Sequence, residues 1–248
     1  THFVEAMNKH RLTLFVFVVT AMACVFFRHY WWLAFVVFLY LLFLFLAVLI
    51  PQLNFFVESL HRIPASGNSV VLTFDDGPMP GHTEKVLAVL AEKKAKACFF
   101  LIGKNMEEHP ELVKQIISEG HQVGHHSYSH VNTFPMWSTQ KVKEDIAKAA
   151  SILGNITGQQ NLRFRIPFGL SNPNIAKAIQ QCNFQSIGWS LRTYDTMSKS
   201  KEQLVQTILS KVKAGDIILL HDWGTYTVDA LPEIIDGVRG KGLEISGL

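Results

Sequence analysis

Two adjacent carboxylates, Asp75 and Asp76, end an apolar run that begins at Val70. The β-branched and aromatic residues of this run predict a buried strand, and the following Gly77-Pro78 turns the chain away from it. Neighbouring carboxylates repel each other unless a cation lies between them or one of them takes up a proton. The pair therefore indicates a metal ion or an acid–base role, although Asp-Gly is also a common turn pair.

Four histidines lie within ten residues farther along the chain, at positions 121, 125, 126 and 130. On one helical turn, the spacing of His126 and His130 would place both imidazoles on the same face. Two imidazoles and one carboxylate, with positions left for water and substrate, form the ligand set of a catalytic zinc site. We expect Asp76 to be the third ligand. The alternative is a polar loop that happens to be rich in histidine.

Further polar residues follow later apolar runs. Arg165 could orient a nearby carboxylate through a bidentate contact, and Gly169 after Phe168 would let backbone N–H groups face a developing oxyanion. Asp195 and His221 follow two more runs, although a single histidine at such a position is more often a satisfied core residue. Because barrel enzymes build their sites at the carboxyl ends of the strands, we expect these groups to lie together.

The elements that must position these residues alternate along the chain from residue 70 onward. The alternation predicts an α/β fold, specifically a deformed (β/α) barrel of about seven parallel strands, with a doubly wound open sheet as the rival. No G-x-G-x-x-G follows the first run, which disfavours a dinucleotide site. Strand-like runs occupy 70–74, 97–102, 122–124, 163–166, 185–190, 216–221 and 243–246, and helix-like stretches occupy 84–94, 110–119, 140–153, 173–182, 201–214 and 228–239.

Local signals mark several helix ends. Asn172 before Pro173 is typical of an N-cap followed by proline at the first helical position, and Ser200 with Gln203 fits a capping box. Three glycines are expected to end helices: Gly120, Gly154 and Gly215.

The first fifty residues are strongly apolar. Residues 31–50 are twenty consecutive residues without a charge, about 30 Å of helix, which predicts a transmembrane segment. Residues 12–27 form a second run of sixteen, so the two runs are either a helical hairpin or one span preceded by a signal-like segment. We predict a membrane anchor over 1–51 that contacts the membrane through 12–50, a linker over 52–69 and a catalytic domain over 70–248.

Charge gives mixed information on orientation and partners. Lys9 and Arg11 favour a cytoplasmic N-terminus, whereas Arg28 between the two runs favours the opposite orientation. We expect the catalytic domain on the extracytoplasmic side. A net charge of +3 without a basic stripe disfavours nucleic-acid binding, and no protein partner is indicated. The three cysteines show no C-x-x-C spacing and leave the compartment open.

The polar segments, taken in order, resemble the motifs of the polysaccharide deacetylase family (the NodB-homology domain, carbohydrate esterase family 4). The resemblance covers roughly residues 70–246. It implies a deformed (β/α) barrel and metal-dependent removal of acetyl groups from an N-acetylglucosamine polymer such as chitin, peptidoglycan or poly-N-acetylglucosamine. The matching motifs are TFDDG at 73–77, HSYSH at 126–130, RIPFG at 165–169, Asp195, and LHD at 220–222.

The resemblance also implies a role for each residue. Asp75 would be the general base and His221 the general acid. Arg165 would orient Asp75, Asp195 would tune His221, and the backbone N–H of Phe168 would stabilise the oxyanion. One divalent metal ion is implied, zinc before cobalt, nickel or manganese. Its ligands would be Asp76, His126 and His130.

Four positions depart from the family pattern. His125 stands where the family usually has Asn, and Phe168 replaces a usual Tyr. Arg192 and Thr196 stand where Asp and Trp are common, which puts the tuning of His221 and one wall of the groove in doubt. Two other readings stay open: the same site could act as an O-acetyl esterase or on a lipid-linked sugar, or the protein could bind glycans without turnover.

Overall fold

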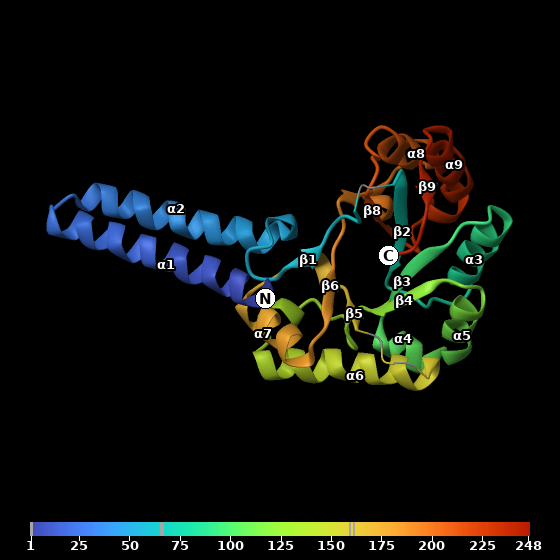
Figure 1. The fold of residues 1–248 in the computed structure, drawn as a ribbon, viewed down its shortest axis with the longest axis horizontal. Helices are drawn as coiled ribbons and strands as arrows, with labels where there is room; N and C mark the ends of the chain where they lie inside the picture. Colours follow the sequence, from blue (N-terminus) through green and yellow to red (C-terminus); the bar gives the residue numbers. More distant parts are fainter. Residues whose placement is uncertain (1, 65–66, 159, 161) are drawn as a thin grey trace.

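A parallel sheet surrounded by helices forms the larger part of the molecule, and a helical hairpin projects from it (Figure 1). The structure is a computed structural model that describes residues 2–64, 67–158, 160 and 162–248; residue 1 of the predicted anchor and residues 65–66 of the predicted linker lie outside this range. The strands are β1 (Ser59–Leu60), β2 (Ser69–Asp75), β3 (Ala97–Leu101), β4 (Gln122–His125), β5 (Arg163–Phe164), β6 (Gln185–Ile187), β7 (Leu191–Arg192), β8 (Ile217–His221) and β9 (Glu244–Ile245).

The chain between β6 and β7 brings the two sides of the sheet together. The strand order is β1-β6-β5-β4-β3-β2-β8-β7, with β9 against β2, and every pair between named strands is parallel. Because β6 pairs with β5 while β7 pairs with β8, one short stretch of chain contacts both sides. The predicted deformed (β/α) barrel is confirmed. The short strands β1 and β7 were not predicted, since two residues leave no alternation to read.

Strand periodicity decides which side chains enter the barrel. Val71 of β2 belongs to an inner apolar cluster with Cys98 and Phe100, whereas Val70 and Leu72 pack outward against the helices. Successive side chains of a strand point to opposite faces. Thr73 and Asp75 therefore share the inner face with Val71. The register pairs Asp75 with His221 of β8, so these two residues lie side by side at the carboxyl edge of the sheet.

The helices largely match the predicted stretches. Asn172 caps its helix by accepting from the N–H of Ile175 at 3.0 Å, and Ser200 accepts from the N–H of Gln203 at 3.2 Å. The stretch 103–108 was not predicted to be helical. The helices are α3 (Thr83–Glu92), α4 (Gly103–Glu108), α5 (Pro110–Ser118), α6 (Thr139–Thr157), α7 (Pro173–Cys182), α8 (Lys201–Leu209) and α9 (Thr227–Gly240).

Two of the three predicted glycine ends are wrong. Gly154 lies inside α6, because the apolar face continues through Ile156 onto the core, and the helix ends at Gly158 with a φ of +68°. Helix α8 ends at Leu209, and Gly215 lies in the turn before β8, where its N–H donates to the carbonyl of Ser69 at 2.7 Å. Gly120 follows α5 with a φ of +80°, as predicted.

The N-terminal runs form a hairpin of two helices, α1 (His2–Phe26) and α2 (Tyr30–Leu49). Phe17 stacks on Tyr40 with ring centroids 4.2 Å apart, and the chain reverses between Phe26 and Tyr30. By length and composition, both helices could cross a membrane. Outward side chains such as Trp31, which is 90% exposed, have no protein partner to cover them among the described residues. The two runs are thus antiparallel helices, and the number of membrane spans stays a prediction.

Candidate metal and catalytic centre

A pocket of about 390 Å³ opens at the carboxyl ends of the barrel strands. It collects residues from five separate segments that the sequence places far apart, as expected for the carboxyl edge of a parallel barrel. Its lining is Asp75, Asp76, His126, His130, Asn132, Ile166, Phe168, Gly169, Trp189, Arg192, Thr196, Leu219, His221 and Trp223.

Asp76, His126 and His130 point their ligand atoms at one another, all within 4.8 Å. Asp76 Oδ1 lies 3.7 Å from Nε2 of His126 and 3.4 Å from Nε2 of His130. This oxygen is buried and has no hydrogen-bond partner among the described residues. Nδ1 of His126 lies 2.8 Å from the carbonyl of Arg165, which fixes the tautomer with a free Nε2 lone pair facing Asp76. This donor set fits a divalent metal ion.

The loop that carries both histidines is not helical, so the predicted helical turn over 126–130 is wrong. Ser127 and His130 have positive φ values of 65° and 45°. Backbone N–H groups of Tyr128 and Ser129 donate to the carboxylate of Asp145, and the N–H of His130 donates to Ser127 Oγ. These bonds replace helical hydrogen bonds. The two imidazoles still converge, with ring centroids 4.7 Å apart.

Protonation states favour metal binding. Burial and the neighbouring His126 lower the pKa of His130 to about 4, so its imidazole is neutral at pH 7. Burial would raise the pKa of Asp76, but the surrounding imidazoles and the indole of Trp223 hold it below its usual value. At neutral pH the cluster therefore presents an ionised carboxylate and a neutral imidazole, the forms that bind a cation.

Asp75 lies beside this cluster and is held by Arg165. Nη1 of Arg165 donates to Asp75 Oδ1 and to Thr73 Oγ1, each at 2.7 Å. The remaining donors reach the carbonyls of Ile187 at 3.1 Å and Gly188 at 2.8 Å. Both side chains are almost fully buried. The second oxygen of Asp75 is free of this bond and lies 3.9 Å from His126 Nε2.

Replacing Arg165 by methionine should therefore destabilise the protein by about 3–5 kcal/mol, because it leaves the Asp75 carboxylate buried without its partner. Urea unfolding followed by circular dichroism measures the change. Arg192→Met, at an exposed position on the pocket rim, is the matched control and should change the free energy of unfolding by no more than about 0.5 kcal/mol. Equal effects of the two substitutions would contradict the role given to the buried pair.

His221 approaches from the other side of the pocket and is paired with Asp195. Its Nδ1 lies 3.0 Å from Asp195 Oδ1, and its backbone N–H donates to Oδ2 at 2.6 Å. Thr193 and Thr227 donate to the same carboxylate, which is 1% exposed. Burial alone would lower the pKa of His221, but the hydrogen bond and charge of Asp195, with the more distant Asp75, raise it to about 9.

Phe168, Arg192 and Thr196, which differ from the usual family residues, also line the pocket. Phe168 has a φ of +61° and a ring centroid 4.7 Å from that of His130. Arg192 and Thr196 line the pocket, and the guanidinium of Arg192 lies over the ring of Tyr194 at 5.0 Å.

Trp223 is a pocket residue for which the sequence indicated no definite role. Its indole Nε1–H donates to Asp76 Oδ2 at 3.0 Å, which leaves Oδ1 directed at the two imidazoles. Its ring, 38% exposed, lines the same pocket as Thr196. The loop after β8 thus supplies a tryptophan at the pocket, whereas the position where the family often has one carries Thr196. A tryptophan directly after the LHD motif was the only signal in the sequence.

The two remaining histidines of the rich segment lie outside the pocket. His125 faces outward from β4, where its ring stacks on Phe164 and meets Phe184 edge-on. Burial and His126 lower its pKa to about 3, so it is a neutral, apolar-like residue. His121 precedes β4, and its Nδ1 accepts from the N–H of Ala97 at 3.2 Å. Because successive side chains point to opposite faces, His126 enters the pocket while His125 packs on the outer side of the barrel.

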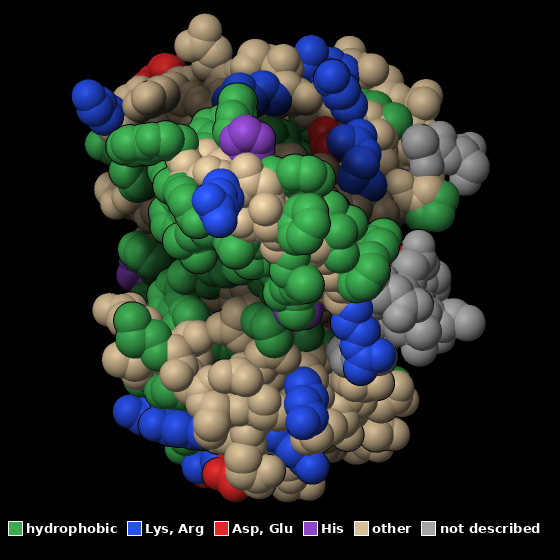
Figure 2. Space-filling view, turned by 90° about the vertical axis from the view of Figure 1, so that its left-hand side faces the viewer, with side chains coloured by type: hydrophobic (Ala, Val, Ile, Leu, Met, Phe, Trp, Pro, Cys, Tyr) green, Lys and Arg blue, Asp and Glu red, His purple; other side chains and the backbone are tan. Residues whose placement is uncertain are grey.

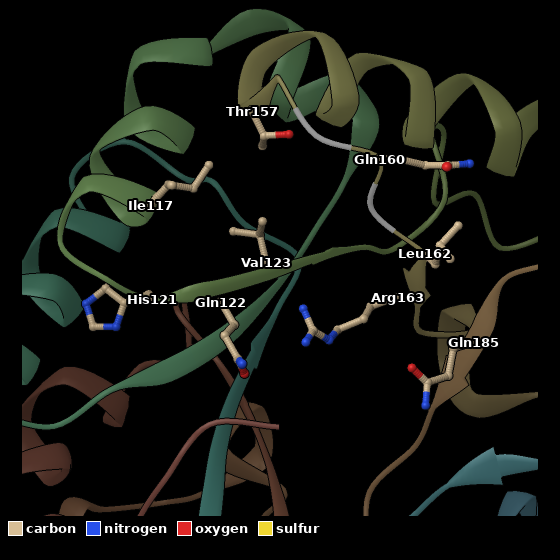
Figure 3. A pocket seen from close by; sticks show the side chains of 9 residues that line it. All are labelled: Ile117, His121, Gln122, Val123, Thr157, Gln160, Leu162, Arg163 and Gln185. Carbon is tan, nitrogen blue, oxygen red and sulfur yellow. The ribbon is translucent and has the colours of Figure 1, made fainter.

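A second pocket, of about 450 Å³, lies at the opposite end of the barrel. Figure 3 shows Gln122, Arg163 and Gln185 at the beginnings of β4, β5 and β6, with Arg163 extending toward Gln122. The described lining contains no carboxylate and none of the predicted site residues. In barrel enzymes this end serves stability rather than chemistry.

The chain is similar to known proteins of one family. The sequence model of the family described as polysaccharide deacetylase matches residues 62–187. A peptidoglycan-N-acetylglucosamine deacetylase of Bacillus cereus is 34% identical over 186 residues, which cover 73% of this chain and 86% of the relative. A chitooligosaccharide deacetylase of Azorhizobium caulinodans is 34% identical over 202 residues, 75% of this chain and 96% of the relative.

Solved structures show the same fold. The Bc1960 peptidoglycan N-acetylglucosamine deacetylase matches with a TM-score of 0.72 and 34% identity, over 76% of this chain and 89% of that one. A mutant of BA3943, described as a pseudoenzyme of the CE4 family with restored activity, matches with a TM-score of 0.72 and 26% identity, over 77% and 70% of the two chains. The fold therefore does not guarantee turnover. From the sequence match and the shared architecture, the chain belongs to the polysaccharide deacetylase family.

Proposed function

We propose that this protein is a metal-dependent hydrolase that removes N-acetyl groups from an N-acetylglucosamine-containing polysaccharide. The observation that carries the proposal is the convergence of Asp76, His126 and His130 beside the buried Asp75 and opposite His221. A non-catalytic glycan-binding protein would not need a base and an acid on either side of a metal cluster. The relatives named for peptidoglycan and chitooligosaccharides support the substrate class.

The residues divide the work of amide hydrolysis. Asp75, held by Arg165, would take a proton from the attacking water. The oxygen of that water would at the same time add to the acetyl carbon. The backbone N–H of Phe168 would donate to the resulting oxyanion. His221, kept as imidazolium by Asp195, would protonate the amine nitrogen as its bond to the acetyl carbon breaks, which releases acetate.

Asp76, His126 and His130 would hold one divalent metal ion. When bound, the ion would polarise the acetyl carbonyl and lower the pKa of water. Two imidazoles and one carboxylate with open positions are typical of catalytic zinc, and cobalt, nickel and manganese are the other candidates.

Trp223 should tune this site through Asp76. Trp223→Phe keeps the ring but removes the N–H that orients the carboxylate, so the affinity for zinc should fall by about 10- to 100-fold. Calorimetric titration of the metal-free chain measures it. Tyr194→Phe, at an exposed aromatic position, is the control and should leave the affinity unchanged. Wild-type affinity in Trp223→Phe would show that the indole does not support the ligand.

The Asp195–His221 pair should set the alkaline limit of activity. His221 acts as an acid only while protonated, so the rate should fall as the pH rises through about 9. Asp195→Asn removes the charge that raises this pKa and leaves the burial that lowers it, so the limit should move to lower pH. A pH profile of kcat between pH 6 and 10 checks the shift, and an unmoved alkaline limit would contradict the assignment.

We propose that residues 1–51 anchor the protein in a membrane, with 52–69 connecting them to the catalytic domain at 70–248. If both helices of the hairpin span the membrane, the beginning of α1 and the catalytic domain would lie on the same side. Because peptidoglycan and chitin-like polymers lie outside the cell, we assign that side as extracytoplasmic. Protease access to the intact cell surface tests this assignment.

Acetate release tests the activity. The purified full chain with zinc should release acetate from chitooligosaccharides, peptidoglycan fragments or poly-N-acetylglucosamine fragments, and an O-acetylated xylan oligomer should react more slowly. Faster turnover of the O-acetyl substrate would make the protein an esterase. Failure on every N-acetylated glycan, with metal bound, would favour a binding protein.

A further inference from the structure

The base of the membrane hairpin is docked on the catalytic domain rather than joined to it by a free tether. Ala47 of α2 is 1% exposed, and Phe55, Phe56 and Val57 after it are each less than 9% exposed. They form one apolar cluster with residues of α6, α7 and β5. His10 of α1 lies against Phe55 and Phe56, each with ring centroids 5.8 Å apart, so both helices share the joint.

The end of the hairpin also contacts residues at the wall of the catalytic pocket. The carbonyl of Val48, near the end of α2, accepts a 3.4 Å bond from the N–H of Ser171, directly after the Phe168–Leu170 turn. Gln52 Nε2 donates to the carbonyl of Trp189 at 3.3 Å, and His61 Nδ1 lies 3.2 Å from the same oxygen. The chain that leaves the hairpin therefore touches the pocket wall.

Trp189 contacts both the chain after the hairpin and the pocket. It lines the pocket, and its ring covers Gly169 so closely that a Cβ there would lie 2.5 Å from the indole. Gly169 also has a φ of +70°, which favours glycine. The turn that carries Phe168 is thus held between the indole on one side and the hairpin base on the other. With the hairpin in a bilayer, this part of the pocket rim lies at the membrane surface.

The face of the domain around the hairpin suits anionic headgroups. Figure 2 looks along the hairpin onto this face, where Lys and Arg side chains are spread around the apolar helices and Asp and Glu are sparse. Lys9 and Arg11 of α1 are exposed on either side of His10, next to the joint. Basic residues close to a membrane are attracted to anionic lipid groups.

We propose that the pocket takes its glycan from the membrane surface, and that its substrate is an N-acetylated amino-sugar chain still attached to a lipid through a diphosphate. This inference rests on the proposed deacetylase function. The acyl chain of such a substrate stays in the bilayer beside the hairpin, its diphosphate faces the basic surface, and the first sugars lie at the height of the pocket rim. A polymer distant from the membrane would gain nothing from a docked anchor.

The test compares one oligosaccharide in two forms, with the full chain reconstituted with zinc in lipid vesicles. An N-acetylglucosamine oligosaccharide is supplied either free in solution or attached through a diphosphate to a polyprenyl lipid in the same vesicles. We expect kcat/KM for the lipid-linked form to be at least about tenfold higher, because the shared membrane raises its effective concentration at the pocket. The advantage should disappear when enzyme and lipid-linked glycan are placed in separate vesicles.

A linker variant separates docking from mere co-localisation. A flexible Gly-Ser segment inserted between Ile50 and Pro51 keeps the anchor but frees the domain from the end of α2. It should retain turnover of the free oligosaccharide and lose most of the advantage for the lipid-linked form. An undiminished advantage would show that docking does not present the substrate.

The outcomes distinguish the two levels of the proposal. Turnover of the free oligosaccharide with no gain for the lipid-linked form would overturn the membrane-surface substrate and leave the deacetylase function standing. No turnover of either form, with metal bound, would overturn both.

Discussion

Asp75→Asn should lower kcat for acetate release by about 10²- to 10⁴-fold, the contribution of a positioned general base. The amide keeps the size of the side chain and can still accept a bond from Arg165, but it cannot take a proton from water. Because Asp75 lies beside the metal cluster rather than among its three ligands, zinc affinity should stay within a few-fold of wild type. Initial acetate-release rates on an N-acetylglucosamine oligomer, with zinc affinity measured in parallel, check both expectations.

A matched substitution controls for general damage near the strand end. Asp222 also follows β8 and is buried, but it accepts a hydrogen bond from Thr83 and does not line the pocket. Asp222→Asn should lower the free energy of unfolding and have a much smaller effect on kcat than Asp75→Asn. Asp75→Asn with near wild-type turnover would remove Asp75 as the base, whatever its effect on folding.

His130→Ala should have the second large effect, because it removes one of three ligands. Zinc affinity should fall by more than the 10- to 100-fold expected for loss of a supporting residue, and turnover should fall with it at limiting zinc. Calorimetry gives the affinity, and high zinc concentration should restore part of the rate. The side chain is only partly buried, so the fold should survive.

His125→Ala is the matched control within the same segment. His125 lies one position before His126 but on the outer face of β4, so its loss should weaken packing against Phe164 and leave zinc affinity unchanged. If His125→Ala abolished metal binding and His130→Ala did not, the ligand set would be wrong.

Much of the barrel could be predicted from the sequence, because apolar runs and amphipathic stretches encode period and order directly. β2 and α7 are examples, each within one or two residues of its predicted bounds. The convergence of Asp76, His126 and His130 followed from the rule that site residues lie at the carboxyl ends of strands. Local signals gave the wrong helix end where tertiary packing determines it. At Gly154 the helix continues, because the buried face of α6 extends beyond this residue.

The remaining features depend on contacts between distant segments. The turn at Ser127–His130 owes its shape to Asp145 on α6, and spacing alone suggested a helix. Trp223 reaches Asp76 across the mouth of the barrel, and Val48 meets Ser171 only because the hairpin docks there. Such pairings have no periodicity or local composition to reveal them.

The most direct measurement is a titration of the metal-free full chain with zinc while acetate release from an N-acetylglucosamine oligomer is followed. With one site formed by Asp76, His126 and His130, the rate should rise in proportion to bound zinc and reach its plateau at one zinc per chain. Full acetate release without metal, or none with that site filled, would contradict the proposed chemistry.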